Sequence, residues 1–352
     1  MPSAPLWFTY TSSTNGSVML AIGLDIGGAN LKAATSDGQA ADRPFPLWKT
    51  PDRLADELSI LLRELPRGDC LAVTMTGELV DGYMSKAEGV RAIVAAAEYA
   101  AADRPCWFWQ TGGEFVSADE AVELTRLVAA ANWHALATFC ARLWPSGNAL
   151  LIDIGSTTTD IIPLIDGRPA STGLTDPERL AAGELLYTGA TRTPLCALGP
   201  TICWNGETFG LAAEFFATTR DLYLILGQEP EAAEDMNTAD GRGATRPHAR
   251  SRLARMLCAD PDEIGDLHEL AALLAAKQRA QIREAIQTMI VRSGDCQALL
   301  VSGSGGHLAR AAIAELPIAR GIEIVNLDAM FAKRVSHSAC AFAVARLAAE
   351  RC

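Results

Sequence analysis

Two short segments of this chain each place a carboxylate beside a turn of small residues, an arrangement that can hold a phosphate. Asp25-Ile26-Gly27-Gly28 lies near the N-terminus, and Asp153-Ile154-Gly155-Ser156 lies near the middle. Small residues allow backbone N–H groups to converge on an anion. Two carboxylates would repel a phosphate unless Mg²⁺ lay between them, directly or through water. The residue types therefore predict an anion site in which Asp25 and Asp153 hold the metal.

The two segments belong to one longer pattern that occurs twice. Leu20–Gly38 and Leu150–Gly167 each contain an apolar run, an Asp-Ile-Gly turn, a second β-type run and an Asp-Gly turn. Asp-Gly between such runs is a strong hairpin signal. We interpret the pattern as a duplicated hairpin that opens each half of the chain. One hairpin alone would favour a plain tight turn with Asp as a turn residue, whereas two matching copies favour phosphate binding.

The copies differ at one informative position, where Lys32 of the first corresponds to Asp160 of the second. Lys32 could neutralise a phosphate oxygen, and Asp160 could act as a base or bind a metal-bound water. Both could equally be solvated strand residues. The residues that we expect to bind the phosphate groups are Gly27, Gly28, Asn30, Lys32, Gly155, Ser156, Thr157, Thr158 and Arg192.

Several other polar clusters follow strands or lie in the least regular part of the chain. Such clusters are usually solvated loops, and a Gly-rich turn is weak evidence by itself. A turn at the end of a strand, however, is where an α/β sheet presents ligand groups. The candidate substrate-binding residues are Thr76, Gly77, Glu78, Asp221, Asp240, Arg242, Gly303, Ser304 and Gly305.

The remaining pattern predicts two α/β lobes, because strands alternate with helices. We expect a disordered extension over 1–18, with Met19 a possible start, and lobes over 19–148 and 149–352. The second lobe would carry a substrate-binding insert at about 187–250, and its closing helix could pack on the first lobe. A capping box at Ser117 predicts one long helix from there toward Leu143.

Composition narrows the partners and the compartment. The chain has 352 residues and a formal net charge of −12, which argues against binding to nucleic acid or to an anionic membrane surface. Nine cysteines are scattered singly, which is typical of free thiols in a reducing cytoplasm. The histidines lack metal-ligand spacing, so no zinc site is expected. Any ligand is then a small molecule.

The two hairpins and the Gly-rich turn Gly303-Ser304-Gly305-Gly306, which follows a late strand, resemble known motifs. These are the phosphate-one, phosphate-two and adenosine motifs of the actin, heat-shock ATPase and sugar-kinase superfamily. The resemblance implies two actin-like, ribonuclease H-like lobes with a cleft between them. DIGSTTTD at 153–160 is similar to the hydantoinase-A/oxoprolinase branch. Longer strings resemble the tetrahydromethanopterin-linked one-carbon-transfer protein family, and these are VTMTGELVD (73–81), ANWHA (131–135), AAGELLYTGATRTP (181–194), EFFATTRD (214–221) and NTADGR (237–242).

This family resemblance implies a synthase of methanofuran or methylofuran biosynthesis. It would join an (aminomethyl)furan-methyl diphosphate to the phenol of tyramine, tyrosine or a glutamyl derivative and release diphosphate. Departure of the diphosphate would depend on charge stabilisation by Mg²⁺, backbone N–H groups and cations. A phenol reacts well only when deprotonated, so a carboxylate base is expected. The expected catalytic residues are Asp153, Asp160, Lys32 and Glu184.

Two other interpretations remain open. Superfamily membership alone favours ATP, and the chain would then be a small-molecule kinase or an ATP-dependent hydrolase of the hydantoinase kind. Fold is weak evidence for chemistry, so ATP is possible but not favoured. The third interpretation is a non-catalytic actin-like scaffold, although no long self-complementary face marks a filament. The Ala-rich helices could pack a homodimer as well as a core.

Overall fold

The structure is a computed structural model that describes residues 19–330 and 333–351. The extension expected over 1–18 lies outside the described residues. Two β-hairpins open two separate sheets, as the duplicated pattern predicted. The strands of the first hairpin have six residues each, and those of the second have seven. No helix in the described ranges is long and apolar enough to cross a membrane.

The first sheet is built from the N-terminal third of the chain. Its order is β3(Ala40–Pro44), β2(Asn30–Thr35), β1(Ala21–Ile26), β4(Cys70–Met75), β5(Cys106–Trp109) and β6(Phe115–Val116). β1 pairs antiparallel with β2 and parallel with β4. One face carries α1(Leu54–Leu62), α2(Lys86–Ala101) and α3(Ala118–Glu123), whose apolar side chains form one core with Ile22, Leu24 and Ile26.

The second sheet begins the same way. Its order is β10(Leu185–Leu186), β8(Thr159–Ile165), β7(Asn148–Ile154), β13(Cys296–Ser302) and β14(Glu323–Asn326), and β9(Arg168–Pro169) pairs with β8. β7 pairs antiparallel with β8 and parallel with β13. Its outer face is covered by α9(Leu267–Ser293) and α10(Gly306–Ala314), which share a core with Leu150, Ile152 and Ile154.

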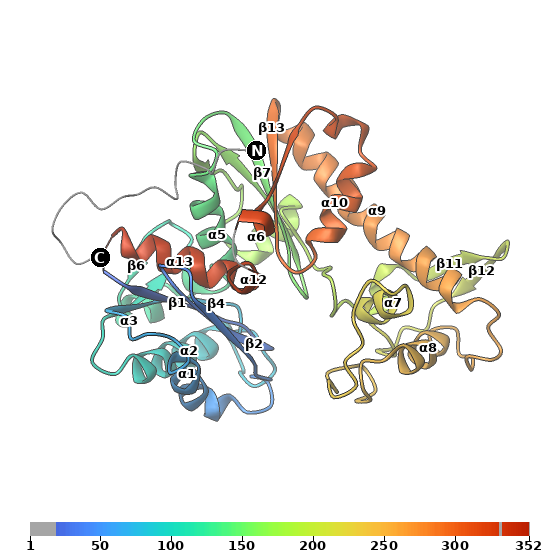
Figure 1. Ribbon diagram of the computed structural model, residues 1–352, viewed down its shortest axis with the longest axis horizontal. Coiled ribbons are helices and arrows are strands. Elements are labelled where there is room, and N and C mark those ends of the chain that lie inside the picture. The colour runs from blue at the N-terminus through green and yellow to red at the C-terminus, as the bar shows by residue number, and fades with distance from the viewer. Residues whose placement is uncertain (1–18, 331–332, 352) are drawn as a thin grey trace.

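A layer of helices lies between the inner faces of the two sheets (Figure 1). It contains α5(Asn132–Ala141) and α13(Ala339–Ala349). Val344 and Leu347 of α13 pack with Ala21 of β1, and Ala341 and Phe342 of the same helix pack with Leu151 of β7. Side chains alternate along a strand. Asp25 and Asp153 are therefore on the inner faces of their sheets, toward this helical layer.

The closing helix α13 fits against β1 without room for a side chain at Gly23. A Cβ atom at this position would lie 1.9 Å from the backbone O of Ala341 and 2.8 Å from the backbone N of Ala345. The glycine thus allows the end of the chain to pack on the first lobe.

The predicted insert contains more regular structure than its sequence suggested. It carries β11(Thr201–Trp204), β12(Glu207–Gly210), α7(Thr219–Ile225) and α8(Arg246–Arg255). Figure 1 shows these elements as a separate group, which the long helix α9 connects to the second sheet. The remaining helices are α4(Thr125–Val128), α6(Asp176–Ala182), α11(Leu327–Met330) and α12(Lys333–His337), with 3₁₀ turns at 51–53, 195–198 and 317–319.

The prediction of one long helix from Ser117 to Leu143 was wrong. The capping box at Ser117 is present, but the segment divides into α3, α4 and α5. Ala129 is extended, with ψ of 132°, and Ala130 has φ of +52°. A run of alanines carries no helix-stop signal, so sequence could not place the break. Burial of Ala130 and its neighbours offsets the small cost of a left-handed alanine.

Gly23→Ala is expected to destabilise the protein by about 1–3 kcal/mol, because the new methyl group must displace α13 from β1. Urea denaturation measures this change. Gly210→Ala is the matched control, since its Cβ would meet nothing within 4 Å among the described residues. It should shift stability by no more than about 0.5 kcal/mol. Equal midpoints for the two variants would contradict the close packing of α13.

Candidate functional site

The two hairpin turns have the same geometry. The backbone N–H of Gly27 donates to the carbonyl of Asn30 at 3.0 Å, and that of Gly155 donates to the carbonyl of Thr158 at 2.9 Å. Asp25 pairs with Lys32 across the first hairpin. In the second, Asp153 pairs with Asp160. The structure thus confirms that Lys32 and Asp160 occupy equivalent positions.

The carboxyl groups at the ends of β1 and β7 act on each other across the lobe boundary. Burial raises the pKa of Asp153 to about 7, with further increases from the charges of Asp160 and Asp25. A hydrogen bond from Ser302 and the charge of Lys32 oppose this rise. Burial also raises the pKa of Asp25, and Lys32 again opposes it. Lys32 therefore lies near both carboxylates.

One carboxylate oxygen of Asp25 lacks a hydrogen-bond donor among the described residues. Its side chain is 8% exposed, and no group in the described part of the chain donates a hydrogen bond to its Oδ1. A buried, unpaired carboxylate oxygen is costly. No set of three or more His, Cys, Asp or Glu side chains within the described ranges could hold a metal. Two carboxylates nevertheless suit Mg²⁺, which commonly keeps several waters and takes phosphate oxygens as further ligands.

Asp160 has a buried partner that the sequence did not reveal. Arg179 of α6 is 1% exposed and forms an ion pair with Asp160. Its guanidinium carbon also lies 4.0 Å from the ring centroid of Trp133, and its Nη1 lies 3.4 Å from Oδ1 of Asp176. One arginine thus fixes the second hairpin to α5 and α6. Sequence gave no signal for this pairing, because the partners come from separate elements.

The loop at residues 188–193 wraps around the second turn. The backbone N–H of Ala190 donates to the carbonyl of Gly155 at 2.9 Å, and that of Arg192 donates to Ser156 at 2.9 Å. A Cβ at Gly189 would lie 2.5 Å from the backbone N of Thr157. The Thr- and Arg-rich loop and the second hairpin therefore form one unit.

This loop is held from behind by a polar side chain of α9. Nε2 of Gln278 donates to Oγ1 of Thr188 at 2.9 Å and to the carbonyl of Gly189 at 2.8 Å. The hydroxyl of Tyr223 donates a hydrogen bond to Oε1 of Gln278 at 2.5 Å. Gln278 was not singled out from the sequence, because a glutamine in a long helix carries no positional signal.

Arg192 reaches toward the other lobe. Its guanidinium carbon lies 5.3 Å from the ring centroid of Trp48, which follows β3. The side chain of Arg192 is otherwise exposed. The cation therefore lies at the boundary between the lobes, next to the turn formed by Gly155 and Ser156.

The first hairpin has its own supporting loop after β4. The backbone N–H groups of Thr76 and Gly77 donate to the carbonyl of Ile26 at 2.9 and 3.0 Å. A Cβ at Gly77 would lie 3.2 Å from the carbonyl of Gly27, and one at Gly28 would lie 2.8 Å from Cγ1 of Val80. Each hairpin thus has a glycine-containing loop packed against its turn.

The late Gly-rich turn supports the second hairpin directly. Gly303 has φ of +87°, and a Cβ there would lie 2.3 Å from the carbonyl of Ile154 and 2.7 Å from Oδ1 of Asp153. A Cβ at Gly305 would lie 2.3 Å from Cγ2 of Ile154. Ser304 between them is exposed. Packing therefore requires both glycines, whatever ligand is bound.

Glu184 is placed differently from the base that the sequence suggested. Its side chain is fully buried and accepts the backbone N–H of Thr172 at 2.6 Å and that of Gly173 at 3.4 Å. These contacts hold the loop before α6. The observed geometry explains the buried carboxylate of Glu184 as a support for this loop, and its role as a base stays an untested prediction.

Two of the three insert residues expected to bind substrate, Asp221 and Asp240, lie in a charged network, and the third, Arg242, is exposed and contributes its backbone N–H. Asp221 accepts from Arg252 at 2.7 Å and caps the first turn of α7. Asp240 accepts from Arg252 at 2.9 Å and from the backbone N–H of Arg242 at 3.2 Å. The network satisfies these charges without a ligand, so it accounts for the cluster as part of the fold. Substrate binding by these residues stays a prediction.

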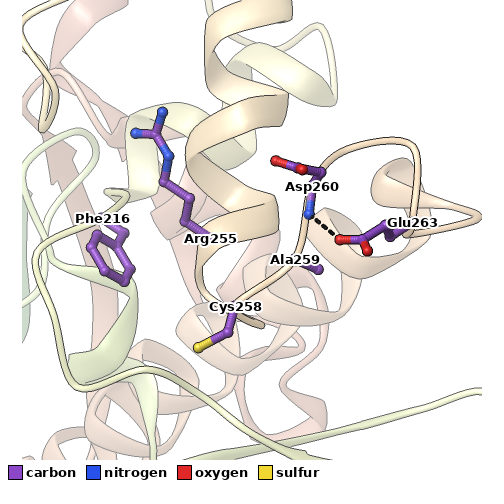
Figure 2. Close-up of a pocket in the computed structure, with 6 residues that line it drawn as sticks. All are labelled: Phe216, Arg255, Cys258, Ala259, Asp260 and Glu263. Carbon is purple, nitrogen blue, oxygen red and sulfur yellow. Dashed lines mark hydrogen bonds between the residues drawn. The ribbon is translucent and has the colours of Figure 1, made fainter.

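A surface hollow of about 350 Å³ lies next to the insert, lined by Phe216 and by residues at and after the end of α8 (Figure 2). Phe216, Arg255 and Cys258 line one part, and Asp260 and Glu263 another. The backbone N–H of Asp260 donates to Glu263 at 2.7 Å. None of these residues belongs to either hairpin or its supporting loop. The hollow is thus separate from the paired turns.

The two lobes, each opened by the same hairpin, define a two-lobed α/β protein of the actin-like fold. Among solved structures, nucleotide-free acetone carboxylase is similar, with a TM-score of 0.52 and 11% identity over 84% of this chain and 67% of that chain. At that identity the similarity shows the fold alone.

Sequence comparison identifies the family. The hydantoinase/oxoprolinase family matches residues 69–351. A (4-{4-[2-(gamma-L-glutamylamino)ethyl]phenoxymethyl}furan-2-yl)methanamine synthase from Methanocaldococcus jannaschii is 34% identical over 94% of this chain and 97% of the relative. A synthase of the same name from Methanococcus vannielii is 32% identical over 57% of this chain and 90% of the relative. The chain belongs to the hydantoinase/oxoprolinase family and, within it, to the family of these methanamine synthases, which confirms the resemblance seen in the sequence.

The raised pKa of Asp153 predicts a pH-dependent stability in metal-free buffer. The folded-state pKa is about 7, above the unfolded value, so the proton stabilises the fold at low pH. This contribution is lost as the pH rises through about 7. Asp153→Asn should therefore lose less unfolding free energy than wild type between pH 5 and pH 8, by at least about 1.4 kcal/mol, the equivalent of one pKa unit.

Urea denaturation in EDTA at the two pH values measures this difference. Asp260→Asn, at an exposed position after α8, is the control and should follow wild type. Equal losses in wild type and Asp153→Asn would show that the buried Asp153 carboxyl does not titrate in this range.

Proposed function

We propose that this protein is a synthase that joins an (aminomethyl)furan-methyl diphosphate to a phenol of the tyramine, tyrosine or glutamyl-tyramine type and releases diphosphate. The observation that carries the proposal is the match to the methanamine synthases over nearly the whole of both chains. The product in their name contains a furan-methyl ether of a phenol, which is the bond that this reaction forms. The paired hairpins supply a place for the departing diphosphate.

The diphosphate lies between the two turns in this proposal. Gly28 supplies backbone on one side, next to Gly27, whose own N–H is donated to the carbonyl of Asn30 and closes that turn. Ser156 and Thr157 supply adjacent hydroxyls on the other, 3.4 Å apart. Lys32 acts on both carboxylates, and Arg192 lies beside the second turn. Such donors, fixed before reaction, stabilise charge where it develops.

In this proposal Asp25 and Asp153 would hold Mg²⁺, with diphosphate oxygens and water as further ligands. Two observations support this assignment. One is the buried Oδ1 of Asp25, which has no hydrogen-bond donor among the described residues, and the other is the raised pKa of both carboxyl groups. A cation would offset the burial and the like-charge repulsion that raise the pKa of Asp153. When bound, the metal would supply charge neutralisation for the leaving group.

The chemical step balances as a substitution. The bond between the furan methylene carbon and the diphosphate oxygen breaks, and its electron pair leaves with diphosphate. The phenol oxygen forms the new C–O bond, and its proton passes to a base. Asp160 is the proposed base because it pairs with Asp153 across the second hairpin, whereas the Glu184 carboxylate is held by loop backbone. Arg179 is then the residue that positions the base.

An ATP-dependent kinase or hydrolase is the competing function. The sequence argument for it was the Gly-rich turn, which resembles an adenosine motif. Close packing of Gly303 and Gly305 on Ile154 gives both glycines a reason that involves no nucleotide. The two glycines therefore no longer argue for ATP, and the preference for the diphosphate-releasing synthase comes from the methanamine synthase relatives.

Condensation without ATP tests the proposal. Purified protein, Mg²⁺, the furan diphosphate and each candidate phenol are mixed, and mass spectrometry should detect the coupled ether with at least one phenol. Asp153→Asn should lower kcat/KM by about 100-fold or more, the scale seen when a charge-stabilising group is removed. Asp260→Asn, in the separate hollow, should react at the wild-type rate.

Two results would count against the proposed reaction. One is the lack of coupled product with every phenol while the archaeal enzyme reacts under the same conditions. The other is full activity of Asp153→Asn with metal present, which would remove this carboxylate from the site.

A further inference from the structure

Glu78 carries a buried carboxylate with an unused oxygen. The residue is 2% exposed, and within residues 19–330 and 333–351 no group donates a hydrogen bond to its Oε2. A carboxylate oxygen in this position is costly unless a donor or a cation reaches it. The residue therefore needs either a proton or a positively charged ligand.

The backbone holds Glu78 rigidly beside the first hairpin. Gly77 packs against Gly27, as described above, and α2 packs against Glu78 itself. A Cβ at Gly89 would lie only 2.1 Å from the backbone O of Glu78. Both contacts require glycine, so the position of Glu78 relative to the turn of Gly27 and Gly28 is fixed by packing on two sides.

A carboxylate of the other lobe acts electrostatically on Glu78. Burial is the main cause of the raised pKa of Glu78, and the charge of Asp176 on α6 adds to it. Hydrogen bonds from the backbone of Glu78 itself and of Ala130 oppose the rise, as does Lys86. The pKa of Asp176 is also raised, first by burial and also by Asp160, against the charges of Arg179 and Lys86. A primary ammonium ion would relieve both carboxylates and supply the missing donor.

We propose that Glu78, together with Asp176, binds the primary ammonium group of the aminomethyl-furan substrate. This inference rests on the proposed function. The names of the two relatives describe their product as a furan methanamine, so the reacting furan ring carries a primary amine on a methylene carbon. At neutral pH such an amine is a cation with three N–H donors, and a charge-assisted hydrogen bond to a buried carboxylate is strong.

The position of Glu78 favours the furan amine over the amine of the phenol partner. Only the furan ring and its two methylene carbons separate the aminomethyl nitrogen from the diphosphate oxygen. Glu78 follows directly on Gly77, which touches the turn that holds the diphosphate in our proposal. In the relatives' product the other nitrogen atoms lie beyond the phenol ring and an ethyl chain. Glu78 and Asp176 would thus select the furan substrate by its charge and set its direction.

Binding without phenol tests this assignment, because the furan diphosphate cannot then be coupled. Isothermal titration with Mg²⁺ compares the aminomethyl-furan diphosphate with an analogue that carries a methyl group in place of the aminomethyl group. Wild type should bind the amine at least about tenfold more tightly, as expected for a charged hydrogen bond. In Glu78→Gln this ratio should fall to within about twofold of unity, with little change for the methyl analogue.

Glutamine closely resembles a protonated glutamate, so the variant separates the two roles. If Glu78 were only a neutral buried carboxyl group, Glu78→Gln would keep the tenfold preference, and that result would overturn the inference. Glu98→Gln, at an exposed position of α2, is the matched control and should keep the wild-type ratio. Asp176→Asn provides a second variant if Glu78→Gln does not fold, and an unchanged ratio there would likewise overturn the assignment.

The binding experiment also separates this inference from the proposed function. Tight binding of both furan diphosphates with equal affinity by wild type would retain the function and overturn the role of Glu78. Failure of wild type to bind either compound would overturn the furan substrate itself, and the ammonium site with it.

Discussion

The structure depends on the burial of like charges where two lobes meet. Asp25 and Asp153 lie at the ends of β1 and β7, on the inner faces of their sheets. Burial is the main cause of the raised pKa of Asp153, and the charges of Asp160 and Asp25 add to it. Burial of Cys340 at the start of α13 shows the same convergence, because both aspartates contribute to the increase in its pKa. Two buried carboxylates without a compensating cation lower the free energy of unfolding. Such repulsion is relieved by a bound cation, and a cation in turn attracts a phosphate.

The duplicated hairpin explains how one short pattern can build both halves of this site. The two turns are closed by equivalent hydrogen bonds, and each is supported by a glycine-containing loop. The difference between the copies lies in charge: Lys32 occupies in the first lobe the position of Asp160 in the second. In our account the first copy neutralises the leaving group, and the second accepts the proton, with Arg179 holding its carboxylate in place. Symmetric backbone and asymmetric side chains thus divide the chemistry between the lobes.

Sequence could predict the features that depend on local pattern. The paired hairpins, the equivalence of Lys32 and Asp160, and the capping box at Ser117 follow from alternation, Asp-Gly turns and residue spacing, and the structure confirms them. Features that depend on distant partners could not be predicted. The ion pair of Asp160 with Arg179 joins separate elements, and the break at Ala130 is set by packing in a run that otherwise favours helix.

The insert shows the same limit. Its mixed Asp and Arg residues suggested a pocket, yet Asp221 and Asp240 are satisfied by Arg252. A sequence pattern cannot distinguish a charged residue that binds a ligand from one that is already paired within the protein. Glu78 illustrates the opposite case, because only the structure shows that one of its buried oxygens lacks a donor among the described residues.

The central claim is that the paired hairpins hold a diphosphate with Mg²⁺ and not a nucleotide. The melting temperature of the protein, measured with Mg²⁺ plus pyrophosphate and separately with Mg²⁺ plus ATP, tests it most directly, because a ligand that binds the folded state raises this temperature. We predict a clear increase with pyrophosphate, lost in Lys32→Met, and a smaller one with ATP. Strong stabilisation by ATP with none by pyrophosphate would contradict the account and favour an ATP-dependent enzyme.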